Sequence, residues 1–125
     1  MKQLAIRHAW TANRVMLGLV MVIPGLLKLM DALNGGDFMF VGMLAGLGFA
    51  APTFFAWAVL TIEILAGLAI LFKFHLHYSV LGPIVILLVA VFTANWGNWP
   101  LVLAHLALVS NFVVLGLDIH SLKSP

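Results

Sequence analysis

Four apolar runs separated by short polar breaks make up most of the chain. The clearest is Ala51–Phe72, a run of 22 residues with one formal charge, Glu63, near its middle. About 20 apolar residues carry a helix across the roughly 30 Å hydrocarbon core of a bilayer. A carboxylate at that depth costs at least about 2.5 kcal/mol, so Glu63 is expected to face a partner or a wet cavity. This pattern predicts a membrane protein.

The remaining runs complete the predicted fold. The expected spans are residues 11–33, 52–72, 78–94 and 100–117, all in one domain that covers residues 1–125. Pro24 lies inside the first span and is expected to kink it. Asp37 is a suitable N-cap for the apolar segment Phe38–Leu47, which is too short to span and is expected to form an interfacial helix. The predicted fold class is all-α: an integral membrane four-helix bundle with a short interfacial helix between the first two spans.

The positive charges predict the orientation of the bundle. The N-terminal region, the loop between the second and third spans, and the C-terminus contain Lys2, Arg7, Arg14, Lys73 and Lys123. The two remaining loops contain no Lys or Arg. The positive-inside rule therefore predicts that both termini are cytoplasmic, and we expect a multi-pass protein of a bacterial or archaeal cytoplasmic membrane.

Composition narrows the possible functions. Hydrophobic residues make up 64% of the chain and charged residues only 8%, with a net charge of +2. The basic residues are scattered and form no stripe, so nucleic acid is not an expected partner. The absence of cysteine excludes disulfides, dithiol chemistry and iron–sulfur ligation by this chain alone. The expected partners are the lipid bilayer and other membrane subunits or further copies of the chain.

Charged and polar residues inside the spans are the candidates for chemistry. With the predicted orientation, Lys28 lies about five residues below the outer end of the first span, and Glu63 about ten below that of the second. This difference in depth is roughly 8 Å, and the two side chains lean toward each other because helical side chains point toward their own N-terminus. His105 falls in the same layer. We expect a polar cluster of Lys28, Glu63 and His105 in the outer half of the bundle.

Several plainer interpretations stay open. Lys28 can instead extend to the outer interface toward Asp31, three residues on. A pair of Lys28 with Glu63 can be purely structural, and a lone histidine such as His105 is more often a packing residue than a ligand.

Other polar residues of the spans fit structural roles better than catalytic ones. Arg14 and Asp118 both lie at cytoplasmic ends and are expected to form a structural pair. Asn111 is expected to form an interhelical hydrogen bond. One face of the first span has residues spaced by three and four, and its glycines would let another helix approach closely; it consists of Arg14, Gly18, Met21, Gly25 and Lys28.

The histidines do not predict a metal or haem site. His75 and His77 point apart on a helix, and His8 and His120 lie in the terminal segments. A haem held by two histidines needs both at one depth on facing helices, and only His105 lies within a span.

The motifs of the first two spans resemble the DoxX family of small four-helix membrane proteins. Arg14 and Lys28 within RVMLGLVMVIPGLLKL are similar to the family's R…G-x-x-K start. TIEILAGLAILF is similar to the family's L-E-x-x-G-G-L-A-I-L-x-G, with Glu63 and Gly67 in register. GLGFAAPTFFAW also resembles the family's approach to that helix. His105-Leu106, where family members often have Asn-Leu, the shortened ending LGLDIHSLKSP and the long region between Lys28 and Glu63 depart from the family pattern.

The resemblance implies a link to quinone-dependent redox chemistry, because some family members are similar to the membrane subunit of a thiosulfate:quinone oxidoreductase. It implies a small subunit of a membrane oxidoreductase system, with quinone as the candidate cofactor and electrons supplied by a partner. The alternative is a non-catalytic structural or assembly subunit of a larger complex. A small-solute transporter is third, because the spans show no inverted-repeat pattern of broken helices. Whether the chain is itself an enzyme stays open at this point.

Overall fold

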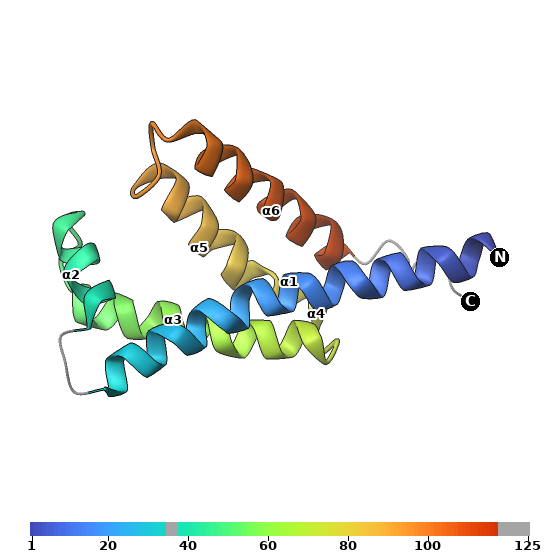
Figure 1. Cartoon of the computed structure of the whole chain (residues 1–125), viewed down its shortest axis with the longest axis horizontal. Coiled ribbons are helices and arrows are strands. Elements are labelled where there is room, and N and C mark those ends of the chain that lie inside the picture. The colour runs from blue at the N-terminus through green and yellow to red at the C-terminus, as the bar shows by residue number, and fades with distance from the viewer. Residues whose placement is uncertain (35–37, 118–125) are drawn as a thin grey trace.

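The computed structural model describes residues 1–34 and 38–117, and every regular element in these ranges is an α-helix. The helices are α1 (Lys2–Leu33), α2 (Met39–Gly46), α3 (Pro52–Leu71), α4 (Leu76–Ser79), α5 (Leu81–Phe92) and α6 (Trp99–Leu117). The predicted all-α class is confirmed. Helices α1, α3 and α6 are long and apolar enough to cross a membrane, and Leu76–Phe92 is a shorter apolar stretch. In chain order, helices α1, α3, α5 and α6 run in alternating directions (Figure 1).

Helix α1 begins well before the predicted start at Thr11. It runs for 32 residues from Lys2 and continues through Pro24. The segment Lys2–Asn13 lacks glycine and proline and is rich in Ala, Leu, Lys, Arg and Gln, which favour helix, so nothing stops the helix at the membrane boundary. At 1.5 Å per residue α1 is about 48 Å long. Its first eight residues, Lys2–Ala9, are exposed and extend beyond the other helices (Figure 1).

The third apolar run, predicted as one span over 78–94, consists of α4 and α5, which are separated at Val80. Pro83 is the third residue of α5 and has no N–H to donate to the carbonyl of Ser79, so the helical ladder is interrupted there. The predicted short helix near residues 38–47 is present as α2. Asp37, its expected N-cap, lies outside the described residues.

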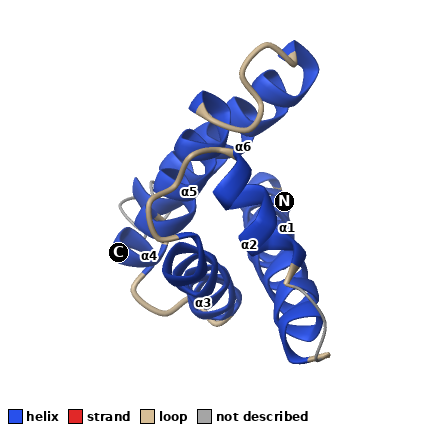
Figure 2. Cartoon of the chain, turned by 90° about the vertical axis from the view of Figure 1, so that its left-hand side faces the viewer, coloured by secondary structure: helices blue, strands red, loops and turns tan. Residues whose placement is uncertain are grey.

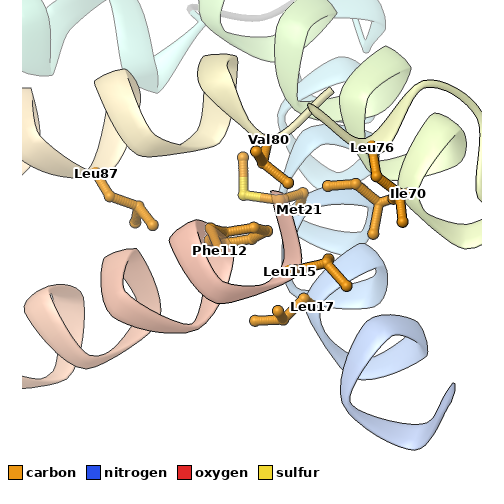
Figure 3. Packing of buried hydrophobic residues seen from close by; sticks show 8 residues of the cluster. All are labelled: Leu17, Met21, Ile70, Leu76, Val80, Leu87, Phe112 and Leu115. Atoms are coloured by element: carbon orange, nitrogen blue, oxygen red, sulfur yellow. The ribbon is translucent and has the colours of Figure 1, made fainter. Parts of the chain in front are cut away.

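The helices are arranged as two pairs that meet near one end. Helix α1 packs chiefly on α3, and α5 chiefly on α6. The two pairs diverge away from α4, as both views show (Figures 1 and 2). The buried cluster at the meeting point takes residues from α1, α3, α4, α5 and α6 (Figure 3); they are Leu17, Met21, Ile70, Leu76, Val80, Leu87, Phe112 and Leu115. Val80, one of these residues, lies between α4 and α5.

Glycines bring α1 and α3 into backbone contact. A Cβ atom at Gly67 would lie 2.9 Å from the carbonyl oxygen of Gly18 and 2.4 Å from a methyl group of Val22. A Cβ at Gly25 would lie 3.1 Å from the Cβ of Glu63. The predicted close approach of a second helix to the Gly18–Gly25 face of α1 is therefore confirmed. The two helices therefore contact each other closely at two points along their length. Gly18 lies against Gly67 at one of them, and Gly25 lies against Glu63 at the other.

Candidate functional site

The structure brings Lys28 of α1 and Glu63 of α3 into direct contact. The Lys28 Nζ atom donates hydrogen bonds to both carboxylate oxygens of Glu63, at 2.7 Å to Oε1 and 2.9 Å to Oε2. The Glu63 side chain is 7% exposed and that of Lys28 is 25% exposed. The contact expected from the depth argument is therefore present, and Lys28 bonds to Glu63 rather than reaching toward Asp31. The pair is the one salt bridge within the described residues.

Local sequence explains why the pair can form. Gly25 lies one helical turn before Lys28 and removes the side chain that would otherwise separate the two helices beside Glu63. Glu63 is consequently buried on the face of α3 that contacts α1, together with Ala56, Leu60, Gly67 and Ile70. A carboxylate buried among apolar residues needs a hydrogen-bonded cation, and Lys28 supplies it.

Helix α2 covers the exposed side of Lys28. The Phe40 ring of α2 lies under the ammonium group, with Nζ 4.5 Å from the ring centroid, a cation–π geometry. The carboxylate of Asp31 in α1 accepts a hydrogen bond from the backbone N–H of Met39 at 3.0 Å, which holds the first turn of α2 beside α1. Phe38 also packs edge-on against Trp57 of α3, with centroids 5.9 Å apart. The short helix therefore bridges α1 and α3 directly over the ion pair.

Sequence reasoning missed Phe40 and Asp31. Asp31 was considered only as a partner for Lys28, although an acidic residue at the end of one helix is a usable cap for the next. No sequence signal singles out Phe40 among the nine phenylalanines.

His105, the third predicted member of the cluster, makes its hydrogen bonds elsewhere. Its Nδ1 lies 2.8 Å from the carbonyl oxygen of Leu101, and its Nε2 lies 3.3 Å from the side-chain nitrogen of Asn95. Since a carbonyl can only accept, Nδ1 carries the proton and Nε2 accepts from Asn95. In the structure His105 joins the first half of α6 to the turn that follows α5, and it makes no hydrogen bond to the Lys28–Glu63 pair.

Arg14 caps the end of α3. Its guanidinium donates to the carbonyl oxygens of Ile70, at 2.8 Å, and Leu71. These carbonyls belong to the last turn of α3, where a cation also compensates the negative end of the helix dipole. Asp118, the expected partner of Arg14, lies outside the described residues. Within the described ranges, no group of three or more His, Asp or Glu residues is gathered in a way that could hold a metal ion.

The Lys28–Glu63 pair can act on a bound molecule in two ways, as a hydrogen-bond donor and as a proton-exchanging group. The ammonium of Lys28 has three N–H groups, of which two are directed to Glu63, so one donor can serve a ligand oxygen. The carboxylate of Glu63 can exchange a proton with a bound molecule.

The chain matches a known protein-family model. The DoxX family model matches residues 9–96. The chain belongs to the DoxX family. The match contains both members of the ion pair and ends before α6, so His105 lies outside it. No curated protein and no solved structure matches the chain. Together with the apolar helices, membership of the DoxX family identifies a membrane protein.

Proposed function

We propose that this DoxX protein is a small subunit of a quinone-linked membrane oxidoreductase system, in which Lys28 and Glu63 contact the quinone head group. The observation that carries the proposal is an ion pair between two apolar helices, in which Glu63 is buried, the Lys28 side chain is partly exposed and one N–H of the ammonium is not directed to Glu63. Ionisable groups within a transmembrane helix are costly, which makes such a pair a candidate functional site. The DoxX resemblance supports the choice of a quinone as the ligand.

The residues around the pair fit a quinone. The head group is a flat ring with carbonyl oxygens, and the Lys28 N–H is a donor for such an oxygen. The Phe40 ring and the apolar surfaces of α2 and α3 offer stacking and apolar contact for the ring and its tail. A quinone supplies two-electron, two-proton chemistry when bound. Glu63 would hold or release a proton beside that oxygen, and Lys28 would orient the oxygen and keep the carboxylate in place.

Electrons would come from a partner subunit under this proposal. The chain has no cysteine for dithiol or iron–sulfur chemistry, and its sequence contains no pair of histidines suited to haem ligation. The proposed role of this chain is accordingly to bind the quinone and manage its protons, with the electron donor on another protein.

Quinone binding tests the proposal. The protein is purified with native lipid, extracted and titrated with a ubiquinone or menaquinone analogue. We expect quinone in the wild-type extract and a binding loss of about tenfold or more in Lys28→Met combined with Glu63→Met, the cost of losing a hydrogen bond from a charged donor. This double variant removes both charges together, so it avoids leaving one buried charge unpaired.

Lys73→Met is the matched control, because Lys73 is an exposed cation in the turn after α3 and should bind quinone as the wild type does. A wild-type preparation that neither carries quinone nor binds added quinone would contradict the proposal.

A second candidate is a non-catalytic assembly subunit. It is favoured by the way in which Lys28 engages both oxygens of Glu63, because this geometry also suits a pair that only fixes the register of α1 against α3. Exchange of the charges, Lys28→Glu with Glu63→Lys, separates the two roles. Recovery of both assembly and function indicates a structural pair, whereas recovery of assembly alone indicates a ligand site.

Orientation and location belong to the same proposal: a bacterial or archaeal cytoplasmic membrane with both termini inside. Reporter fusions after Lys123 and within Lys73–His77 should report a cytoplasmic position, because these segments contain the basic residues. A fusion at Gly35-Gly36 should report the outside. An external C-terminus would contradict this topology.

A further inference from the structure

A groove lies between the second half of α3 and helix α4, which is beside the end of α3 (Figure 1). Its volume is about 910 Å³, in the range of small-molecule sites. Leu65, Leu68 and Phe72 line one side of it, and all three are exposed. Their spacings of three and four residues place them along one side of α3, roughly 180° around the helix from Glu63. We call this hollow the α3–α4 groove.

Hydrogen bonds hold the opposite side of the groove in place. The backbone N–H of Phe74 donates to the carbonyl oxygen of Ala69 at 2.7 Å, and the Ser79 hydroxyl donates to the carbonyl oxygen of Phe74 at 2.7 Å. Leu76, 6% exposed, anchors α4 in the buried cluster. The lining also includes the half-buried Ala66 and Ala69, whose small side chains leave the space open. The groove is therefore formed before any molecule enters it.

Polar side chains are gathered at the α4 end of the groove. Lys73 lies between two lining residues, Phe72 and Phe74, and is exposed. It forms no salt bridge with residues 1–34 and 38–117. His75 and Tyr78 line the groove and offer a ring N–H and a phenol O–H as donors. Because this turn ends a helix long enough to cross a membrane, it lies at the depth of the lipid head groups.

The backbone at this turn is one that lysine and histidine seldom adopt. Lys73 has φ 58° and His75 has φ 46°, both in the left-handed region that favours glycine. A glycine at either position would fit without steric cost. Residues kept in such a conformation point to a role for their side chains. Here those side chains supply a charge and a donor at the α4 end of an apolar groove.

We propose that the α3–α4 groove binds an anionic phospholipid, with an acyl chain along Leu65, Leu68 and Phe72 and the phosphate at Lys73. The apolar lining suits the chain, and an exposed ammonium without a carboxylate partner suits a head group of net negative charge. The choline group of a zwitterionic lipid would meet the same ammonium with like charge. A quinone has an apolar tail but no charge for Lys73 to bind. The inference is independent of the proposed quinone role, because the groove faces away from the Lys28–Glu63 pair.

Lipid titration tests the role of the charge. The protein is stripped of lipid in detergent and titrated with phosphatidylglycerol or phosphatidylcholine of equal chain length, and bound lipid is counted by native mass spectrometry. We expect phosphatidylglycerol to bind at least about fivefold more tightly, and Lys73→Asn to remove this preference, the effect of one cation at a membrane surface. Asparagine tolerates the left-handed backbone, so this variant should melt at or above the wild-type temperature. Lys73→Arg should keep the preference.

Lys2→Asn is the matched control for the charge, because Lys2 is an exposed cation at the start of α1. It should bind phosphatidylglycerol as the wild type does. Equal affinity of the wild type for the two lipids, or an unchanged preference in Lys73→Asn, would overturn the proposal.

Filling the groove tests the position of the acyl chain. Ala69→Phe should weaken phosphatidylglycerol binding by about tenfold, because its ring takes the space of the chain. Thr61→Phe adds the same ring at an exposed position of α3 outside the groove lining and should leave binding unchanged. Lys28→Met with Glu63→Met should also keep the lipid, so a failed quinone proposal leaves this one standing. Wild-type binding by Ala69→Phe, or displacement of the lipid by a quinone analogue, would show that the groove is not a phospholipid site.

Discussion

Glu63→Gln is expected to lower the free energy of unfolding by roughly 3–5 kcal/mol, the cost of breaking a buried ion pair by removing one partner. The reason lies in Lys28, whose ammonium loses the two oxygens at 2.7 and 2.9 Å that compensate its charge within the apolar helices. The Phe40 ring alone provides too little compensation, because a cation–π contact contributes about 0.5–2 kcal/mol. Thermal or denaturant unfolding in detergent measures the change.

Lys28→Met should destabilise the protein by a similar amount, because it leaves the Glu63 carboxylate buried and unpaired. The double variant Lys28→Met with Glu63→Met should unfold close to the wild type, since apolar replacement of a whole buried pair is often neutral. Two single variants with near-wild-type stability would show that the pair does not hold α1 to α3.

Gly67→Ala is expected to destabilise the α1–α3 pair by about 2–3 kcal/mol. The new Cβ would lie 2.9 Å from both the Gly18 carbonyl oxygen and the Val22 backbone nitrogen. Backbone atoms cannot rotate away, so the helices must separate, and overpacking of this kind costs about 1–3 kcal/mol or more. The separation would also lengthen the contact between Lys28 and Glu63, which lies farther along the same interface. Unfolding in detergent measures the loss.

Gly42→Ala is the matched control for that substitution. Gly42 lies inside α2 and a Cβ there would meet no atom within 4 Å. Because alanine favours helix over glycine, this variant should be unchanged or more stable by up to about 1 kcal/mol. If Gly67→Ala behaves like Gly42→Ala, the close approach of α1 and α3 is not a determinant of stability.

The features that depend on hydrophobic length and depth could be predicted from the sequence. Glu63 and Lys28 were expected to meet because depth in a bilayer follows from residue number along a helix, and the structure brings them together. The position of His105 could not be derived in the same way. Depth does not determine the rotation of a helix about its axis, and in the structure α6 presents His105 to Asn95.

Helix boundaries and contacts outside the apolar pattern were harder to predict. The start of α1 was placed at the membrane boundary, but a helix ends where its backbone or side chains disfavour it, and residues 2–13 favour it. The cap of α2 by Asp31 depends on how the chain turns between two helices, which hydrophobic periodicity does not encode. Asn111 was expected to form an interhelical hydrogen bond, but its side chain forms none with residues 1–34 and 38–117.

The short length of the apolar stretch formed by α4 and α5 has a consequence for the lipids around the protein. The apolar stretch Leu76–Phe92 comprises 17 residues, about 26 Å if fully helical, whereas α6 beside it has 19. If this stretch spans the bilayer, as the sequence predicts, a membrane with a hydrocarbon core of about 30 Å is expected to thin next to α5, at a cost of a fraction of a kcal/mol for each Å of mismatch. Short-chain lipids relieve this cost, so the protein should gather in thinner regions of a mixed membrane and be most stable in bilayers of shorter acyl chains.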